Sequence, residues 1–282
     1  MRVLILRCGD APLPADPPGT VLNLPEVPGR RDLRPLDALA AELLPADPTP
    51  SLDEISAQPD VPHLGAPGPA PQAPHLEEGL RVVVVGTDAA LSAVLTRMMR
   101  GDYLWAELAF VPVGESVAAR NWGIDVSGAW DLALGGQVRP VPVIRSDQGI
   151  AVAGSATIRS WDDGEITGEI VVDSHVLLRH EAREDVRFNG VFGARLVPMV
   201  DAPGIAAVRA TQPENPVLNW REKIARRLGG TPPLDPDSLA TGRAVQAGGP
   251  ALAVAVDGVR HRRPLERVTF YRHLRDLQVI RP

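Results

Sequence analysis

The sequence predicts a parallel α/β domain followed by an antiparallel, β-sandwich-like domain, and three observations support this fold class. Four consecutive valines, residues 82–85, end at Gly86 before an amphipathic helix pattern, which indicates a buried parallel strand, a tight turn and a helix. A second strand–turn–helix pattern covers residues 108–122. From about residue 138 short β-rich segments alternate with turns. Open α/β sheets bind ligands at the carboxyl ends of strands, so the turn Gly86–Asp88 is the first candidate site.

The chain before the valine strand is expected to hold one strand, one helix and a long loop. Residues 2–7 are apolar enough for a buried strand, and the leucines of residues 33–43 suit a helix that ends before Pro45. Nine prolines lie from Pro45 to Pro74, so we interpret residues 45–76 as a solvated, proline-rich loop without chemistry.

The rest of the first domain alternates strands and helices. Residues 80–85 form the central strand, and apolar positions from Leu91 to Met98 recur at helical spacing, with Asp88 expected to cap that helix. A buried strand over residues 108–113 and a helix that begins at Ser116 follow. This order predicts parallel strands joined by right-handed crossovers.

The second half is expected to be mostly antiparallel, with hairpin-type turns at residues 161–165 and 189–190 and one helix near residues 218–228. The strands are expected at residues 141–144, 150–158, 168–172, 186–188, 194–200, 205–210, 243–246, 251–257, 268–271 and 277–280. These patterns place the first domain at residues 1–136 and the second at residues 137–282, with the C-terminus packing back on the first domain.

Composition excludes several classes of function. The net charge is −6 and aromatic residues make up 4% of the chain, so nucleic acid is not an expected partner. Cys8 is the only cysteine, which excludes an intrachain disulfide and a cysteine-rich zinc site and favours a reducing, cytoplasmic location. The only lysine, Lys223, does not follow a glycine-rich loop, so there is no Walker A motif. The sequence has no run of about twenty apolar residues that would span a membrane.

Two motifs carry a family resemblance. The central strand leads into Gly86-Thr-Asp-Ala-Ala-Leu-Ser-Ala93, and the next strand leads into Pro112-Val-Gly-Glu-Ser116, followed by Asn121-Trp-Gly-Ile124. The chain resembles the diacylglycerol kinase catalytic-domain family, lipid kinases that are related in fold to NAD kinases. That family has Gly-Gly-Asp-Gly-Thr-Leu-Asn-Glu at the first position and Pro-Leu-Gly-Thr-Gly-Asn-Asp-Phe-Ala-Arg at the second. Gly86, Asp88 and Leu91 match the first motif.

Two later segments agree with the resemblance, which runs in order through residues 80–282. Residues 130–143 are similar to the family's entry into its second domain, and Asp257-Gly258 is similar to its Asp-Gly-Glu turn. Val259 replaces the glutamate that serves as catalytic base in that family. The first strand ends in Arg7-Cys-Gly-Asp10 instead of the family's Asn-Pro-x-Ser-Gly loop.

The resemblance implies ATP-dependent phosphoryl transfer, with Mg²⁺, to the hydroxyl of a lipid or another small molecule. Asp88 is the catalytic residue that it implies, and the nucleotide would contact Gly86, Thr87, Asp88, Gly114, Glu115 and Ser116. The replaced glycines, and the negative charge of Glu115 where a phosphate would lie, predict weakened nucleotide binding. The alternative is a catalytically inactive relative that acts as a binding or scaffold module.

Other polar clusters have structural alternatives. Asp88 and Ser116 can be helix caps, Asp257-Gly258 a plain hairpin turn, and Asp162, Asp163 and Glu165 a solvated turn rather than a cation site. His175 and His180 lie five residues apart, so in a strand they face opposite sides and do not share a metal. The C-terminal arginines from Arg260 to Arg281 are interpreted as a salt-bridged surface, with an anionic headgroup and peripheral membrane contact as the alternative. Oligomerisation remains open.

Overall fold

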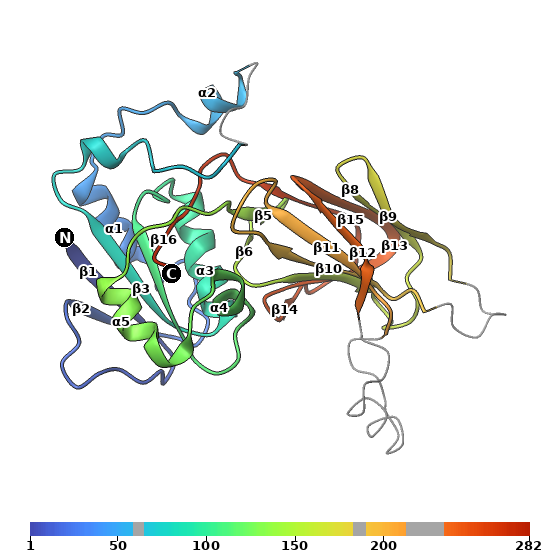
Figure 1. Ribbon diagram of the computed structural model, residues 1–282, viewed down its shortest axis with the longest axis horizontal. Helices are drawn as coiled ribbons and strands as arrows, with labels where there is room; N and C mark the ends of the chain where they lie inside the picture. Colours follow the sequence, from blue (N-terminus) through green and yellow to red (C-terminus); the bar gives the residue numbers. More distant parts are fainter. Residues whose placement is uncertain (59–64, 183–189, 213–233) are drawn as a thin grey trace.

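The computed structural model describes residues 1–58, 65–182, 190–212 and 234–282. It consists of a parallel α/β domain and an antiparallel β domain that lie side by side (Figure 1). The predicted fold class is therefore confirmed. The predicted strand 186–188, the Asn189 turn position, the helix near 218–228 and Lys223 lie outside the described residues.

The first domain is built on a parallel sheet, whose strand order in the described chain is β16-β4-β3-β1-β2. Its strands are β1 (Arg2–Cys8), β2 (Thr20–Leu24), β3 (Leu80–Gly86), β4 (Glu107–Pro112) and β16 (Gln278–Val279). All four pairings are parallel. The edge strand β2 is not expected from the sequence, because its side chains are half exposed and show no continuous apolar run. The C-terminal strand β16 completes the other edge.

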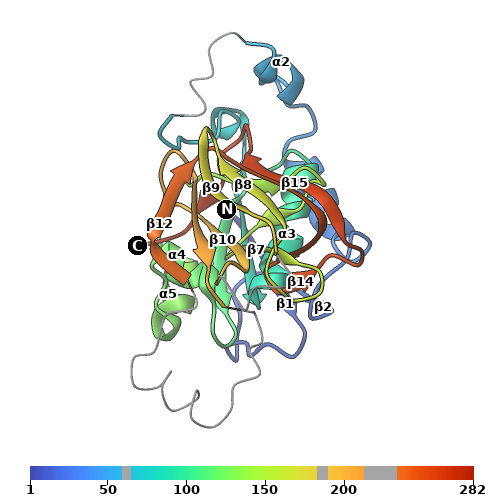
Figure 2. The ribbon, with the colours of Figure 1, turned by 90° about the vertical axis from the view of Figure 1, so that its right-hand side faces the viewer.

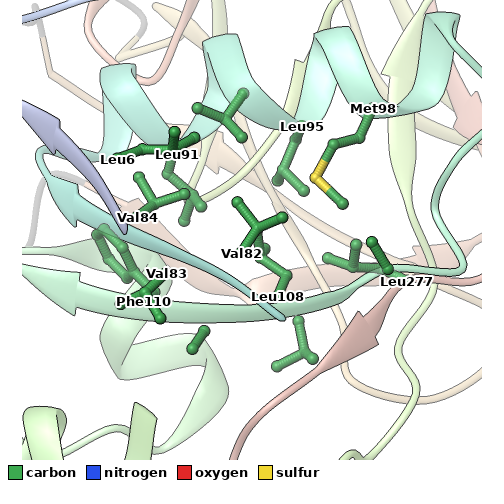
Figure 3. Packing of buried hydrophobic residues seen from close by; sticks show 14 of the residues in the cluster. Leu6, Val82, Val83, Val84, Leu91, Leu95, Met98, Leu108, Phe110 and Leu277 are labelled. Atoms are coloured by element: carbon green, nitrogen blue, oxygen red, sulfur yellow. The ribbon is translucent and has the colours of Figure 1, made fainter. Parts of the chain in front are cut away.

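Helices cover this sheet and bury the valine strand. They are α1 (Arg34–Leu43), α3 (Asp88–Arg100), α4 (Val117–Trp122) and α5 (Ala129–Gly135), with 3₁₀ turns at Ala73–His75 and Val126–Gly128. Figure 3 shows Leu91, Leu95 and Met98 of α3 packed over β3 and β4. Val82, Val83, Val84 and Val85 are completely buried, and each such side chain contributes roughly 2 kcal/mol of hydrophobic free energy. The predicted strand–helix alternation is confirmed.

The second domain is antiparallel throughout its described part and faces the viewer in Figure 2. Its strands are β5 (Ile144–Ser146), β6 (Ala151–Val152), β7 (Ala156–Ser160), β8 (Gly168–Val172), β9 (His175–His180), β10 (Gly193–Pro198), β11 (Ile205–Ala210), β12 (Leu234–Gly242), β13 (Ala244–Val256), β14 (Val259–Arg260) and β15 (Leu265–Arg272). The first half of β13 pairs with β8 and the second half with β7, with an irregular register between them. One long strand thus joins the β8–β9 pair to the rest of the antiparallel sheet.

Long-range pairing changes three local predictions in this domain. The predicted segments 243–246 and 251–257 are one strand, β13, because β15 pairs across the irregularity between them. The predicted strand 150–158 is two strands, β6 and β7, separated by a loop. Residues 161–165 do not form a hairpin turn, because β7 and β8 pair with β13 rather than with each other.

The proline-rich segment is not a simple solvated loop. It contains α2 (Leu52–Ser56), where Ser51 and Glu54 form a capping box. The backbone of this segment accepts hydrogen bonds from Arg272 at Gly65 O (2.7 Å) and from Arg275 at Pro50 O (2.7 Å).

These contacts also correct the interpretation of the C-terminal arginines as a surface. Arg272 and Arg275 are buried, and their terminal nitrogens donate to backbone carbonyls of the proline-rich segment and, for Arg272, to the carboxylate of Asp276. No helix in the described part of the chain has the length and apolarity needed to cross a membrane.

Candidate functional site

The turn after β3 is held by local packing. A Cβ atom at Gly86 would lie 2.9 Å from Cys8 Cβ and 3.1 Å from Ala90 Cβ, so close packing of β1 and α3 requires glycine there. Thr87 is the N-cap of α3, and its Oγ1 accepts a hydrogen bond from Ala90 N (3.3 Å). The expectation that Asp88 caps α3 is therefore wrong, since Asp88 is the first residue of the helix itself.

The Asp88 carboxylate instead binds the beginning of α4. It accepts hydrogen bonds from the Ser116 hydroxyl, from Val117 N (2.7 Å) and from Ala118 N (3.3 Å). The first amides of a helix have no partners within the helix, and a carboxylate is a strong acceptor for them. A side chain from the first strand–turn–helix unit thus supplies the anion at the helix of the second unit.

The second predicted turn lies beside the first, because Val113 N donates to Gly86 O (2.9 Å). Ser116 is buried and caps α4 as expected, with its Oγ accepting from Ala119 N (2.9 Å). Gly114 has a positive φ of 77° and open space around the position of a Cβ. Glu115 is exposed and has no hydrogen bond or ion pair to any described residue. The structure thus brings Gly86, Thr87, Asp88 and Ser116 together, and leaves Glu115 outside their hydrogen-bond network.

Asp257 is a second half-buried carboxylate at this place, in the segment that is similar to the family's Asp-Gly-Glu turn and for which a plain hairpin was the structural alternative. The turn between β13 and β14 is present, with positive φ at Asp257 (49°) and Gly258 (82°). In addition, the Asp257 carboxylate accepts hydrogen bonds from Ala153 N (2.8 Å), Gly154 N (2.7 Å) and Ser155 N (2.8 Å). The amides come from the loop between β6 and β7, about a hundred residues away in the sequence. No local pattern reports such a contact.

Burial raises the pKa of Asp257 to about 7; the three amide hydrogen bonds oppose this shift, and the nearby charge of Asp88 adds to it. Gly154 lies between the two carboxylates. A Cβ atom there would be 2.7 Å from Asp88 Oδ2 and 2.9 Å from Ala118 N, and Asn121 Nδ2 donates to Gly154 O (2.9 Å). We call Asp88, Ser116, Asn121, Gly154 and Asp257 the interdomain junction.

A cavity of about 530 Å³ lies next to the junction, between α3 and the strands β13–β15. Its walls combine apolar side chains with arginines, and none of the described residues that line it is aspartate or glutamate. The first domain contributes one side of α3 and the segment from Val27 to Leu33, and the second contributes β13–β15 and the loop after β5. We call this space the interdomain cavity.

The residues present do not fit ATP with Mg²⁺. Magnesium in kinases is held by carboxylates, but the Asp88 and Asp257 oxygens already accept hydrogen bonds, and no acidic side chain in the described part of the chain lines the cavity. Among the described residues no group of three His, Cys, Asp or Glu side chains could hold a metal. Glu266 is exposed, Asp276 is paired with Arg272 (2.8 Å), and neither is among the described residues that line the cavity beside Val259.

The other acidic cluster is structural. Asp162 accepts from Ser160 Oγ (2.6 Å) and Gly164 N (3.1 Å), and Glu165 accepts from Gly190 N (2.6 Å). Asp163 lies 3.8 Å from Arg260. These carboxylates serve different partners, as expected for a turn rather than a cation site.

Comparison with known proteins gives matches in structure. No protein-family model and no curated protein sequence matches the chain. Two crystal structures from Bacillus anthracis str. Sterne match all of it: a diacylglycerol kinase with 12% identity and a TM-score of 0.52, and a putative diacylglycerol kinase with 11% identity and a TM-score of 0.50, each covered over 97% of its length. The fold is diacylglycerol kinase-like. This match confirms, at the level of architecture, the resemblance seen in the motifs.

Proposed function

We propose that this chain is a non-catalytic relative with a diacylglycerol kinase-like fold, and that it binds a small molecule in the interdomain cavity. The observation that carries the proposal is the Asp88 carboxylate, which accepts the Ser116 hydroxyl and the first amides of α4. Phosphoryl transfer depends on free donors and metal ions placed around the phosphates. In this chain the donors next to the turn are bound by its own carboxylates.

The alternative is ATP-dependent phosphoryl transfer to a lipid hydroxyl, which the match to two diacylglycerol kinase structures favours. In that case Asp88 would act at the nucleotide and Mg²⁺, and the turns at Gly86 and Gly114 would shape the phosphate site. Val259 and Glu115 argue against it, because the first supplies no base and the second repels phosphate. The domain boundary at residues 136 and 137 and a cytoplasmic location are parts of the same proposal.

Isothermal titration calorimetry of the full chain with ATP·Mg²⁺, and separately with NAD, tests the proposal. We expect no heat of binding at millimolar nucleotide. A micromolar dissociation constant for ATP·Mg²⁺ that is lost in Asp88→Asn and kept in Glu115→Gln would overturn the proposal and support the kinase. Circular dichroism of both variants separates loss of binding from loss of folding.

A further inference from the structure

The interdomain cavity differs in charge from the rest of the chain. The whole sequence has 35 acidic and 29 basic residues, whereas the cavity lining, as far as the structure describes it, has no acidic residue. Five arginines contribute to that lining: Arg30, Arg97, Arg100, Arg260 and Arg262. A cleft lined by one sign of charge, with apolar walls of low dielectric constant, attracts ligands of the opposite charge.

Three of the five arginines are held by the protein. Arg97 makes two hydrogen bonds to Asp37 (2.6 and 2.7 Å). Arg100 donates to the carbonyl oxygens of Gly149 (3.0 Å) and Gln148 (2.9 Å). Arg260 donates to Trp161 O (2.7 Å) and stacks over its ring. Arg97 has a close carboxylate partner and Arg260 has a more distant one, Asp163 at 3.8 Å, whereas Arg100 is bound by carbonyl oxygens.

The remaining two arginines lie on opposite walls. Arg30 belongs to the segment between β2 and α1, and Arg262 follows β14. Neither side chain has a hydrogen bond or an ion pair to any residue that the structure describes, and both are exposed. One unpaired guanidinium from each domain therefore borders the same space.

The walls between these arginines are aliphatic. Val254, Val256, Val259, Leu265 and Val268 line the second-domain side. Val259 is 55% exposed, and Val27, on the opposite wall, is 45% exposed. Exposed apolar side chains that face one another across a cavity are a common feature of ligand sites, which pair apolar walls with a few polar anchors.

We propose that the interdomain cavity binds an anionic amphiphile, a molecule with an aliphatic chain and a carboxylate or phosphate headgroup. The chain lies against the valines, and the headgroup pairs with Arg30 and Arg262, whose planar donors suit both anions. The volume of about 530 Å³ is within the usual range for small-ligand sites. This inference rests on the proposed function, because it names the ligand class of the same cavity. A neutral lipid would leave the arginines without a partner.

Calorimetry with decanoate and with decyl phosphate, each below its micellar concentration, tests the inference on the full chain. We expect at least one of them to bind, and a neutral decyl glycoside to bind at least tenfold more weakly. Comparing the two anions tells a carboxylate ligand from a phosphate ligand. Acetate and inorganic phosphate, which lack the chain, are expected not to bind at the same concentrations.

Matched variants locate the binding. The double variant Arg30→Gln/Arg262→Gln is expected to weaken binding at least tenfold. The control Arg31→Gln/Arg263→Gln removes the same charge from exposed neighbours that do not line the cavity, and is expected to bind normally. Ala93→Phe, which places a ring in the cavity from α3, is expected to abolish binding.

Three results would overturn the inference: equal binding of the neutral glycoside, an equal loss in both double variants, or retention on anionic vesicles without binding of the soluble amphiphiles. The last would make the basic rim a membrane-contact surface. These failures differ from a failure of the proposed function, because the proposed function fails only if the chain binds ATP·Mg²⁺. A chain that binds neither nucleotide nor amphiphile contradicts only the ligand class proposed here.

Discussion

Helix α3 takes part in both the interdomain junction and the interdomain cavity, and the two regions treat polar groups in opposite ways. In the junction the Asp88 carboxylate accepts three hydrogen bonds, and the Asp257 carboxylate accepts three more. In the cavity Arg30 and Arg262 have no partner among the described residues.

The difference separates a structural region from a binding region. Buried polar groups that are fully satisfied make a region rigid and leave no donor or acceptor for a ligand. Charges without internal partners, next to exposed aliphatic side chains, keep their capacity to bind. The motif that resembles a nucleotide turn belongs to the first kind, and the neighbouring cavity belongs to the second. Substitutions at Asp88, His273 and Gly154 test how much such buried polar groups and close contacts contribute to stability.

Loss of the Asp88 carboxylate is expected to have the largest effect. Asp88→Ala leaves the Ser116 hydroxyl and the amides of Val117 and Ala118 without their acceptor, which should lower the free energy of unfolding by about 2–4 kcal/mol. Urea denaturation followed by circular dichroism measures this change. Glu115→Gln, on the same turn but exposed and unpaired, should stay within about 0.5 kcal/mol of the parent. Similar stabilities for both variants would mean that the junction does not hold the domains.

His273 is a buried polar group of another kind, since its Nε2 has no hydrogen-bond partner among the residues that the structure describes. Burial, assisted by the charges of Arg145 and Arg275, lowers the pKa of His273 to about 4, below the unfolded value of about 6.5. The folded state therefore resists protonation: its full stability is present above about pH 6.5 and is lost as the pH falls toward 4. We expect His273 to lower the free energy of unfolding by about 2–3 kcal/mol at pH 4 relative to pH 7.

The measurement is the free energy of unfolding between pH 4 and pH 7 in the parent and in His273→Leu. Asp257 has the opposite sign, because its raised pKa makes its contribution decline as the pH rises from about 4 to about 7. The parent therefore shows a partly cancelled profile. His273→Leu should show stability that falls with rising pH, and Asp257→Asn should show the reverse. Unchanged slopes in both variants would contradict the assignment.

Filling the space at Gly154 is expected to have the smallest of the three effects. In Gly154→Ala the new methyl group would press on Asp88 Oδ2 and Ala118 N, which should lower the free energy of unfolding by about 1–2 kcal/mol. Gly135→Ala is the matched control, since a Cβ there meets nothing within 4 Å and Gly135 lies in a helix. Thermal denaturation of both variants is the measurement. If Gly154→Ala is as stable as Gly135→Ala, the loop between β6 and β7 can shift away from Asp88 and α4 without loss of stability.

Sequence reasoning succeeded where a local pattern determines local structure. The apolar run of β3, the helical spacing of α3 and the cap at Ser116 all follow from neighbours within a few residues. It failed at β2, which has no continuous apolar run, and at the loop between β6 and β7, which Asp257 holds from far along the chain. The wrong cap assignment at Asp88 has the same origin. Threonine and aspartate are both common N-cap residues, and the Asp88 carboxylate binds the distant helix α4 instead.

The sequence by itself determined the order of strands and helices and the motifs that resemble diacylglycerol kinases, because burial patterns and turn residues act over short distances. Only the tertiary structure decided that Asp88 binds a helix 29 residues away, and that Arg30 and Arg262 border one cavity. A carboxylate or a guanidinium takes whichever partner the packed domains place within reach. The partners of these side chains depend on how the two domains pack against each other, and a local sequence pattern does not show that packing.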